Sequence, residues 1–191
     1  MKILRSLSLG LLLPLAGCQI DNYTYETPYD EPWRVPEKGT VIELKQPLTF
    51  SPGSSRIYIQ DGVISSRRGV NDYRPWCQFY LYESKEDMKH ARTIQPDQFT
   101  VVRASQNVKY VQFKPVDVAA VGIGSPYMFA QGEVGAQTLA TTMKLTSSKQ
   151  PQVQELICAT SDDARRQNFV SVNKIQATLG DIAELHLPLV Q

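Results

Sequence analysis

Short runs of β-branched and aromatic residues, separated by turns rich in glycine, proline and serine, are the feature that most limits the folds open to this chain. In residues 76–82, the side chains at positions 77, 79 and 81 are apolar and alternate with those at 78, 80 and 82, which is the period of a strand with one buried face. Similar runs occupy residues 40–44, 48–50, 56–61, 62–64, 99–103, 108–113, 139–145 and 155–159. The pattern predicts a mainly β fold, an antiparallel sandwich or barrel of about seven or eight short strands.

One helix is expected near the C-terminal end of the chain. Ser171 suits an N-cap, the apolar residues Val172, Ile175 and Leu179 follow at helical spacing, and Gly180 suits the position just after a helix. The apolar tail at 182–190 is expected to pack back on the body of the domain. The sequence therefore predicts a β domain with one C-terminal helix.

The beginning of the chain has the layout of a secretory signal peptide. Lys2 and Arg5 are followed by an apolar run over residues 7–15 that is too short to cross a bilayer. The run closes with Leu15-Ala16-Gly17-Cys18, which resembles the lipobox of bacterial lipoprotein precursors.

This resemblance implies cleavage before Cys18, a diacylglyceryl group on its thiol and acylation of the new amino group. Gln19 stands where an aspartate often retains such proteins in the inner membrane, so the resemblance implies a lipid anchor in the outer membrane, on its periplasmic side. An ordinary signal peptide, with Cys18 as a bystander, and an uncleaved membrane anchor are the alternatives.

Three segments follow from this interpretation: a lipoprotein signal peptide at 1–17, a lipidated tether rich in proline and tyrosine at 18–39, and a periplasmic β domain at 40–191. Closely spaced prolines exclude a helix from the tether and make a central strand there unfavourable. The alternative is that the aromatic residues of this segment pack on the domain or on a partner. Residues 117–137 lack a periodic pattern and are expected to form a long loop.

If Cys18 carries lipid, only Cys77 and Cys158 remain among the three cysteines. Both lie in predicted strands, and disulfides persist in oxidising compartments such as the periplasm, so a Cys77–Cys158 disulfide is expected. A reactive thiol pair is the alternative, but the chain has no Cys-x-x-Cys motif and neither cysteine has a histidine near it in the sequence.

Sequence signals for catalysis or for nucleic-acid binding are weak. The 20 basic residues nearly balance the 19 acidic ones, so no nucleic-acid partner is expected. His90 lies in a charged run and is expected to be solvated, whereas His186 is expected to be partly buried and hydrogen-bonded, or exposed at an edge. Asp162 and Asp163 are typical of a solvated turn. No catalytic residue, metal ligand or cofactor is therefore expected.

One loop between predicted strands combines residue types that are enriched at interface hot spots. It is predicted to recognise an acidic group through three arginines, a tyrosine and a tryptophan, namely Arg67, Arg68, Tyr73, Arg74 and Trp76. The alternative is structural: the loop is a hairpin tip held by a pair between Asp72 and an arginine, with Trp76 turned into the core beside Cys77.

Together these features predict a non-enzymatic binding or accessory module of an envelope assembly. Its expected partners are the outer membrane, through the lipid, and another envelope protein. A small periplasmic hydrolase without a recognisable motif is one alternative, which would need a serine near a base or a perturbed buried carboxylate. A periplasmic inhibitor with a protruding rigid loop, or a small-ligand carrier with an enclosed apolar pocket, is the other.

Overall fold

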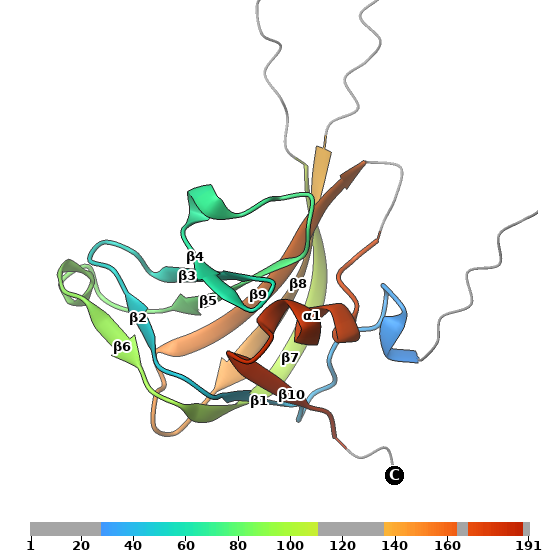
Figure 1. The fold of residues 1–191 in the computed structure, drawn as a ribbon. Coiled ribbons are helices and arrows are strands. Elements are labelled where there is room, and N and C mark those ends of the chain that lie inside the picture. The colour runs from blue at the N-terminus through green and yellow to red at the C-terminus, as the bar shows by residue number, and fades with distance from the viewer. Residues whose placement is uncertain (1–27, 111–135, 164–167, 189–191) are drawn as a thin grey trace, which may run out of the picture.

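A computed structural model describes residues 28–110, 136–163 and 168–188 (Figure 1). This part of the chain contains ten strands, one α-helix and three short 3-10 helices. The strands are β1 (Val41–Leu44), β2 (Leu48–Phe50), β3 (Arg56–Gln60), β4 (Val63–Ser65), β5 (Trp76–Leu81), β6 (Arg92–Ile94), β7 (Asp97–Tyr110), β8 (Ala136–Thr146), β9 (Val153–Asp163) and β10 (Ala183–His186). The helices are η1 (Pro28–Asp30), η2 (Arg67–Gly69), η3 (Asp87–Lys89) and α1 (Val172–Leu179). None of the helices in these ranges has the length and apolar character needed to cross a membrane.

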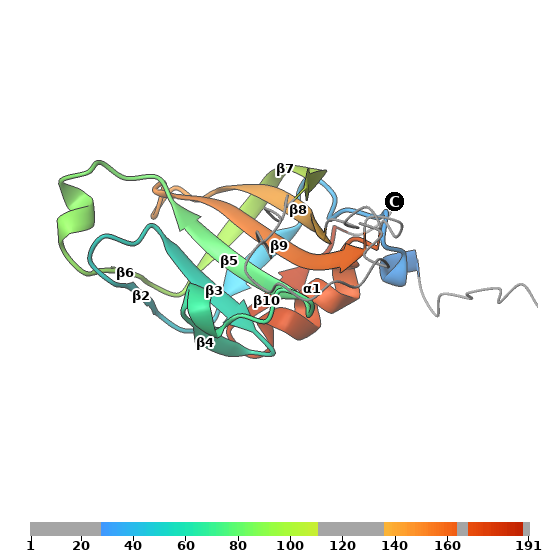
Figure 2. The ribbon, with the colours of Figure 1, turned by 90° about the horizontal axis from the view of Figure 1, so that it is seen from above.

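Eight of the strands form one antiparallel sheet in the order β10-β1-β7-β8-β9-β5-β3-β4, and β2 pairs with β6 in a separate two-stranded sheet. The large sheet curls, and α1 contacts β3, β5 and β10 (Figures 1 and 2). The predicted mainly β, antiparallel fold with one C-terminal helix is confirmed. The interior of the domain forms because the eight-stranded sheet curls around its own apolar face.

The two ends of the curled sheet approach each other at the end of α1. Gly62, in the turn between β3 and β4, donates its N–H to the carbonyl of Thr178 at 2.9 Å. Gly180 follows the helix with φ 55°, and a Cβ added there would lie 2.7 Å from the Cα of Gly62. A side chain at 180 would therefore collide with the opposite end of the sheet.

Helix α1 forms where its sequence signals predicted it. The Ser171 hydroxyl accepts a hydrogen bond from the N–H of Lys174 at 3.4 Å, as an N-cap should. Ile175 and Leu179 are fully buried in the main core, which also contains Phe50, Phe79 and Phe99. The apolar face of the helix thus completes the interior of the curled sheet.

Strand β7 is longer than expected. The sequence predicted two strands, at 99–103 and 108–113, whereas β7 runs without interruption through the polar residues between them, and residues 111–113 lie outside the described part. Pairing with β8 continues from Thr100 to Tyr110, with one register shift between Val101 and Arg103. Strands β6 and β10 were not predicted, because both are short and gain their regular conformation from pairing with distant segments.

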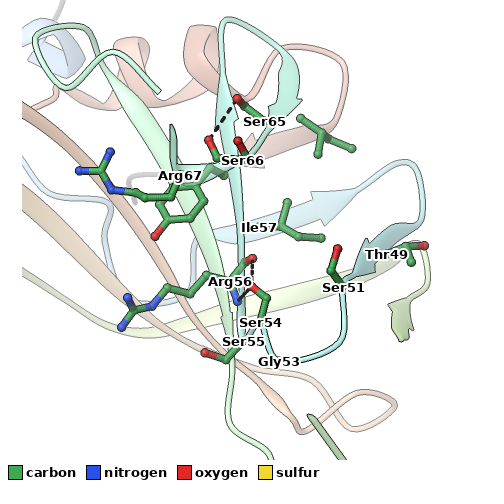
Figure 3. A pocket seen from close by; sticks show the side chains of 12 residues that line it. Thr49, Ser51, Gly53, Ser54, Ser55, Arg56, Ile57, Ser65, Ser66 and Arg67 are labelled. Atoms are coloured by element: carbon green, nitrogen blue, oxygen red, sulfur yellow. Dashed lines mark hydrogen bonds between the residues drawn. The ribbon is translucent and has the colours of Figure 1, made fainter. Parts of the chain in front are cut away.

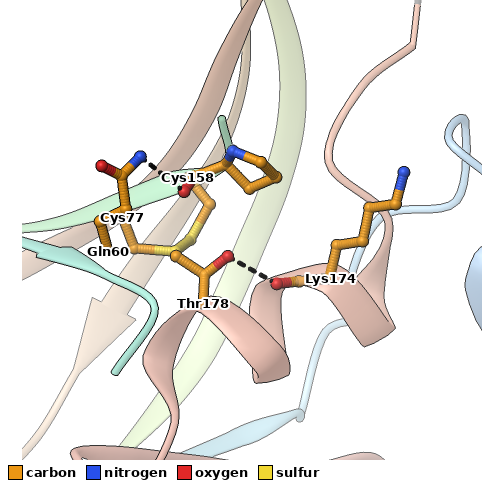
Figure 4. The surroundings of a disulfide bond; sticks show 6 residues. Gln60, Cys77, Cys158, Lys174 and Thr178 are labelled. Carbon is orange, nitrogen blue, oxygen red and sulfur yellow. Dashed lines mark hydrogen bonds between the residues drawn. A yellow bond between two sulfur atoms is a disulfide. The ribbon is translucent and has the colours of Figure 1, made fainter. Parts of the chain in front are cut away.

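The disulfide between Cys77 and Cys158 is confirmed (Figure 4). The two residues face each other directly in the register of β5 and β9, and both are fully buried. Their sequence separation is 81 residues. The bond therefore links two distant segments of the chain in the middle of the sheet.

Residues 28–39, which were assigned to the tether, lie against the domain. Asn173 of α1 donates to the carboxylate of Asp30 at 2.8 Å, and the Gln106 amide donates to the carbonyl of Pro32 at 2.7 Å. The predicted signal peptide, Cys18 and the remainder of the predicted tether lie outside the described residues, as does most of the predicted loop at 117–137.

Candidate functional site

A groove of about 550 Å³ lies beside the edge of β3, at the point where β4 ends (Figure 3). Its lining residues come from β2, the turn after β2, β3, β4 and the start of η2: Thr49, Ser51, Gly53, Ser54, Ser55, Arg56, Ile57, Tyr58, Ile64, Ser65, Ser66 and Arg67. Five of these residues are serines and two are arginines. None of these described lining residues carries a carboxylate or an imidazole.

The two walls of the groove differ in chemistry. Arg56 and Arg67 project to one side of β3, whereas Ile57, Thr49 of β2 and Ser51 just after β2 lie on the other side (Figure 3). Successive residues of a strand point to opposite faces, so the side chains of Arg56 and Ile57 must diverge. The groove consequently has one basic wall and one wall that is partly aliphatic.

The floor of the groove is the backbone edge of β3 at Arg56. Strand β4 pairs with β3 only from Tyr58 to Gln60, so it stops short of Arg56. There the Ser54 hydroxyl accepts a hydrogen bond from the Arg56 N–H at 3.2 Å and donates one to the Arg56 carbonyl at 2.9 Å. One hydroxyl group thus occupies the place of a neighbouring strand.

Arg92 holds the turn that carries Ser54. Its guanidinium donates to the Ser54 carbonyl at 2.7 Å and pairs with the Glu83 carboxylate at 2.6 Å. The side chains of Arg92 and Glu83 are only 14% and 10% exposed. Gly53 adds a backbone hydrogen bond to the carbonyl of Met88 at 2.6 Å. A largely buried ion pair therefore holds the turn that contributes Ser54 to the floor of the groove.

Of the residues predicted to recognise an acidic group, Arg67 alone lines the groove, and it already has a partner. Its guanidinium lies 2.9 Å from the Asp72 carboxylate, and this hydrogen bond is the main reason why the pKa of Arg67 is raised. The same group lies over the rings of Tyr58 and Trp76, at 5.9 and 5.7 Å from their centroids. Arg67 therefore has a structural role in addition to lining the groove.

The other members of the predicted loop are arranged separately. Arg74 pairs with Asp61 at 2.7 Å, while Arg68 is exposed and Tyr73 is 69% exposed. The Gln60 side chain braces the loop, because its amide nitrogen donates to three backbone carbonyls, those of Asn71, Arg74 and Pro75, at 2.9, 3.3 and 3.1 Å. The loop is thus held by the Arg67–Asp72 pair, as the structural alternative supposed, and in addition by the Arg74–Asp61 pair and by Gln60.

Trp76 is turned into the interior, as the structural alternative supposed, but on the other face of β5 from Cys77. Trp76 is buried, but in a second apolar cluster that also includes Tyr58 and Val70. Cys77 points into the main core, so the preceding residue must point to the opposite face of β5. That face is covered by the loop that carries Val70. The indole N–H of Trp76 has no hydrogen-bond partner within the described ranges.

His186 lies at the sheet edge, in a group of charged residues on β1 and β10. Its Nε2 is 2.9 Å from a carboxylate oxygen of Glu43, and Glu184 pairs with Lys45. The hydrogen bond with Glu184 raises the pKa of Lys45, and the same bond lowers the pKa of Glu184. Glu43, Glu184 and His186 offer ligand atoms within 4.8 Å of one another. The hydrogen bond between His186 and Glu43 and the ion pair between Glu184 and Lys45 account for this proximity. His90 is exposed, as expected.

Asp97 belongs to a polar network outside the groove, and its side chain is only 6% exposed. Burial acts to raise its pKa, but hydrogen bonds from Ser147 at 2.6 Å, from Gln150 at 3.2 Å and from the Gln98 N–H at 2.9 Å outweigh it. Lys149 lies 3.8 Å away and acts in the same direction. The pKa of Asp97 is therefore lowered, which is typical of a structural carboxylate that stays ionised.

Sequence analysis did not identify Arg56 or the serines as a site. Residues 51–55 had the composition of a turn, and Arg56 began a predicted strand. The available signal was the serine-rich run next to an arginine and followed by alternating apolar residues. This sequence pattern indicates a binding site only once the end of β4 and the position of β2 are known.

Comparisons with protein-family models, with curated proteins and with solved structures found no match for this chain.

Proposed function

We propose that this protein is a lipid-anchored, non-enzymatic binding module of the bacterial envelope, held at the periplasmic side of the outer membrane by acyl chains on Cys18. The groove beside Arg56 carries the binding part of the proposal, because it joins two arginines and five serines without a lining carboxylate. The sequence Leu15-Ala16-Gly17-Cys18 supports the anchor. Several acyl chains give a stable attachment, whereas a single chain binds only marginally.

The fold separates the groove from the side where the tether enters. Helix η1 and the β2–β6 arm lie at opposite ends of the domain in both views (Figures 1 and 2). Between Cys18 and Pro28 the chain has about ten residues, which reach at most about 35 Å when fully extended. A tether of this length, entering at η1, would hold the domain near the membrane with the groove at its far end.

The chemistry of the groove favours binding over hydrolysis. A serine nucleophile needs an adjacent base, and no histidine or carboxylate is found among the described groove residues. A small-ligand carrier would need an enclosed apolar pocket, whereas this groove is open and rich in hydroxyl groups. Arginine and serine side chains suit a ligand with an acidic group.

The inhibitor hypothesis draws support from the braced loop at 66–75. Gln60 and the Arg67–Asp72 pair fix the loop, and Tyr73 is 69% exposed on it. A rigid loop that presents an aromatic side chain suits insertion into the site of another protein. This second candidate differs from the first in the surface that makes the contact.

The anchor is tested by mass spectrometry of protein recovered from separated membranes. We expect an acylated N-terminal Cys18 in the outer-membrane fraction and a soluble or precursor form for Cys18→Ser. An unmodified Cys18 in mature protein would contradict the anchor.

The binding site is tested by photocrosslinking in intact cells, with the crosslinking residue placed at Ser66 in the groove, at Tyr73 on the loop, or at Val102 as an exposed control on β7. The proposal expects a defined adduct from Ser66 that is lost when Arg56 is replaced by glutamine. An adduct from Tyr73 alone would favour the inhibitor, and equal adducts from Ser66 and Val102 would refute a specific groove.

A further inference from the structure

The edge of β3 at Arg56 has the backbone geometry of a strand-docking position. The Leu81 N–H bonds the Ser55 carbonyl at 3.0 Å, so Ser55 faces β5. Hydrogen-bonding groups of successive residues alternate between the two sides of a strand, so those of Arg56 face away from β5 and into the groove. Strand β4 reaches only to Ser65, opposite Tyr58, and the chain then turns into η2 at Arg67.

Resting on the proposed function of the groove, we infer that its ligand is an extended polypeptide segment of a partner protein, with acidic side chains on one face and aliphatic side chains on the other, which pairs with β3 at Arg56. The N–H and C=O of one ligand residue would take the two positions that the Ser54 hydroxyl now fills. The segment would lie in line with β4 and occupy the place that β4 leaves.

The two arginines of the groove are the reason why one face of the ligand should be acidic. Arg56 lies over the Tyr80 ring, 5.7 Å from its centroid, and within the described ranges it has no carboxylate partner. Arg67, on the same wall, is already paired with Asp72. An acidic ligand side chain on this side would therefore meet Arg56 as its principal counter-charge, with Arg67 adding to the positive potential.

The isoleucines on the opposite wall of the groove are the reason why the other face of the ligand should be aliphatic. Ile64 lies across from Ile59 in the register and therefore shares a face with Ile57. Like Ile57, Ile64 lines the groove, and Ile64 is 46% exposed at its rim. Alternate side chains of a docked strand would point toward these residues and cover them. A free anion would use the basic wall but would leave this aliphatic wall and the strand edge unused.

The test uses the acylated full-length chain in a nonionic detergent and measures fluorescence anisotropy of labelled pentapeptides. The first peptide alternates glutamate and valine, acetyl-Glu-Val-Glu-Val-Glu-amide. The second has lysine in place of glutamate, and the third carries an N-methyl group on the amide of the central glutamate, which removes one backbone donor. We expect saturable binding of the first peptide and about tenfold or greater weakening for each of the others.

Variants of the chain separate the side-chain contribution from the backbone contribution. Arg56→Gln is expected to weaken binding of the first peptide by about tenfold, the scale of one charge-assisted hydrogen bond. Arg103→Gln, at an exposed arginine on β7, is the matched control and should leave binding unchanged. Ser54→Ala removes the hydroxyl that competes for the Arg56 edge and should tighten binding by about two- to threefold. Circular dichroism checks that each variant is folded.

Several outcomes would overturn strand docking. Equal affinity for the N-methylated peptide, weaker binding by Ser54→Ala, or binding that free glutamate or inorganic phosphate reproduces in full would each show that β3 does not pair with the ligand. If the peptides fail but the Ser66 crosslink in cells still depends on Arg56, the groove remains a binding site for another acidic ligand. If both fail, the proposed function fails with the docking model.

Discussion

The ion pair between Arg92, the first residue of β6, and Glu83 should contribute far more to stability than an exposed surface ion pair does. Both side chains are almost buried, their charged atoms lie 2.6 Å apart, and Arg92 also donates to the carbonyls of Ser54 and His90 at 2.7 Å each. Arg92→Met keeps much of the side-chain length but leaves the Glu83 carboxylate without its counter-charge. Removing one member of a buried pair costs about 3–5 kcal/mol, and the residual exposure here places the expected loss near the lower limit, about 3 kcal/mol.

Urea denaturation at neutral pH, with the disulfide intact, measures this loss as a change in the free energy of unfolding. A double-mutant cycle with Glu83→Gln should give a coupling energy of about 2 kcal/mol, because the second substitution costs much less once the first charge has gone. Lys89→Met is the matched control, since Lys89 and Glu86 form a pair 2.7 Å apart with side chains that are 63% and 75% exposed. It should change stability by less than about 0.5 kcal/mol.

Similar losses for Arg92→Met and Lys89→Met, or a coupling energy below about 0.5 kcal/mol, would refute the assignment of a buried bracing pair. Because Arg92 holds the carbonyl of Ser54, Arg92→Met should also weaken pentapeptide binding in protein that is still folded. Peptide binding of unchanged strength would show that the turn keeps its shape without this contact.

Three further predictions concern other parts of the fold. Replacing Cys77 and Cys158 together with alanine should lower the free energy of unfolding by about 4 kcal/mol in urea denaturation, since their separation is 81 residues; a loss below about 1 kcal/mol would contradict this. The pKa of Asp97 is lowered in the folded state, so its contribution is complete above the unfolded pKa of about 3.9 and disappears as pH falls through the folded pKa. Asp97→Asn should therefore be less stable at pH 7 and should flatten the acid side of the stability profile; parallel acid slopes would disprove the assignment. Gly180→Ala should lower the thermal midpoint clearly more than Gly39→Ala, because only at 180 would the added Cβ meet backbone, at 2.7 Å.

Local sequence signals were sufficient to predict the elements whose structure depends on residues close in the sequence. The cap at Ser171 and the glycine at 180 bound the one α-helix, since capping groups act within a single turn. The alternation in 76–82 identified β5, although it indicated one buried face. The second face of β5 is also largely buried, because Trp76 packs there in a second apolar cluster with Tyr58 and Val70.

The candidate site depended on contacts that sequence spacing does not encode. Arg56 and Ser54 were visible as a strand start and a turn residue, but their roles follow from the early end of β4 at Ser65 and from the place of β2 beside them. Arg67 and Asp72 formed the local pair that the structural hypothesis supposed. Residues close in sequence were thus paired correctly, whereas the groove needed segments brought together by the sheet.

By itself, the sequence indicated a mainly β chain with one C-terminal helix and the pairing of Cys77 with Cys158, and its residues 15–18 resemble a lipobox. These features depend on local periodicity, on capping and on the small number of cysteines. The tertiary structure alone decided where the groove lies and which arginine faces it without a carboxylate partner among the described residues. The reason is physical: strand order and register are set by burial of the whole sheet, and they determine which edge remains open.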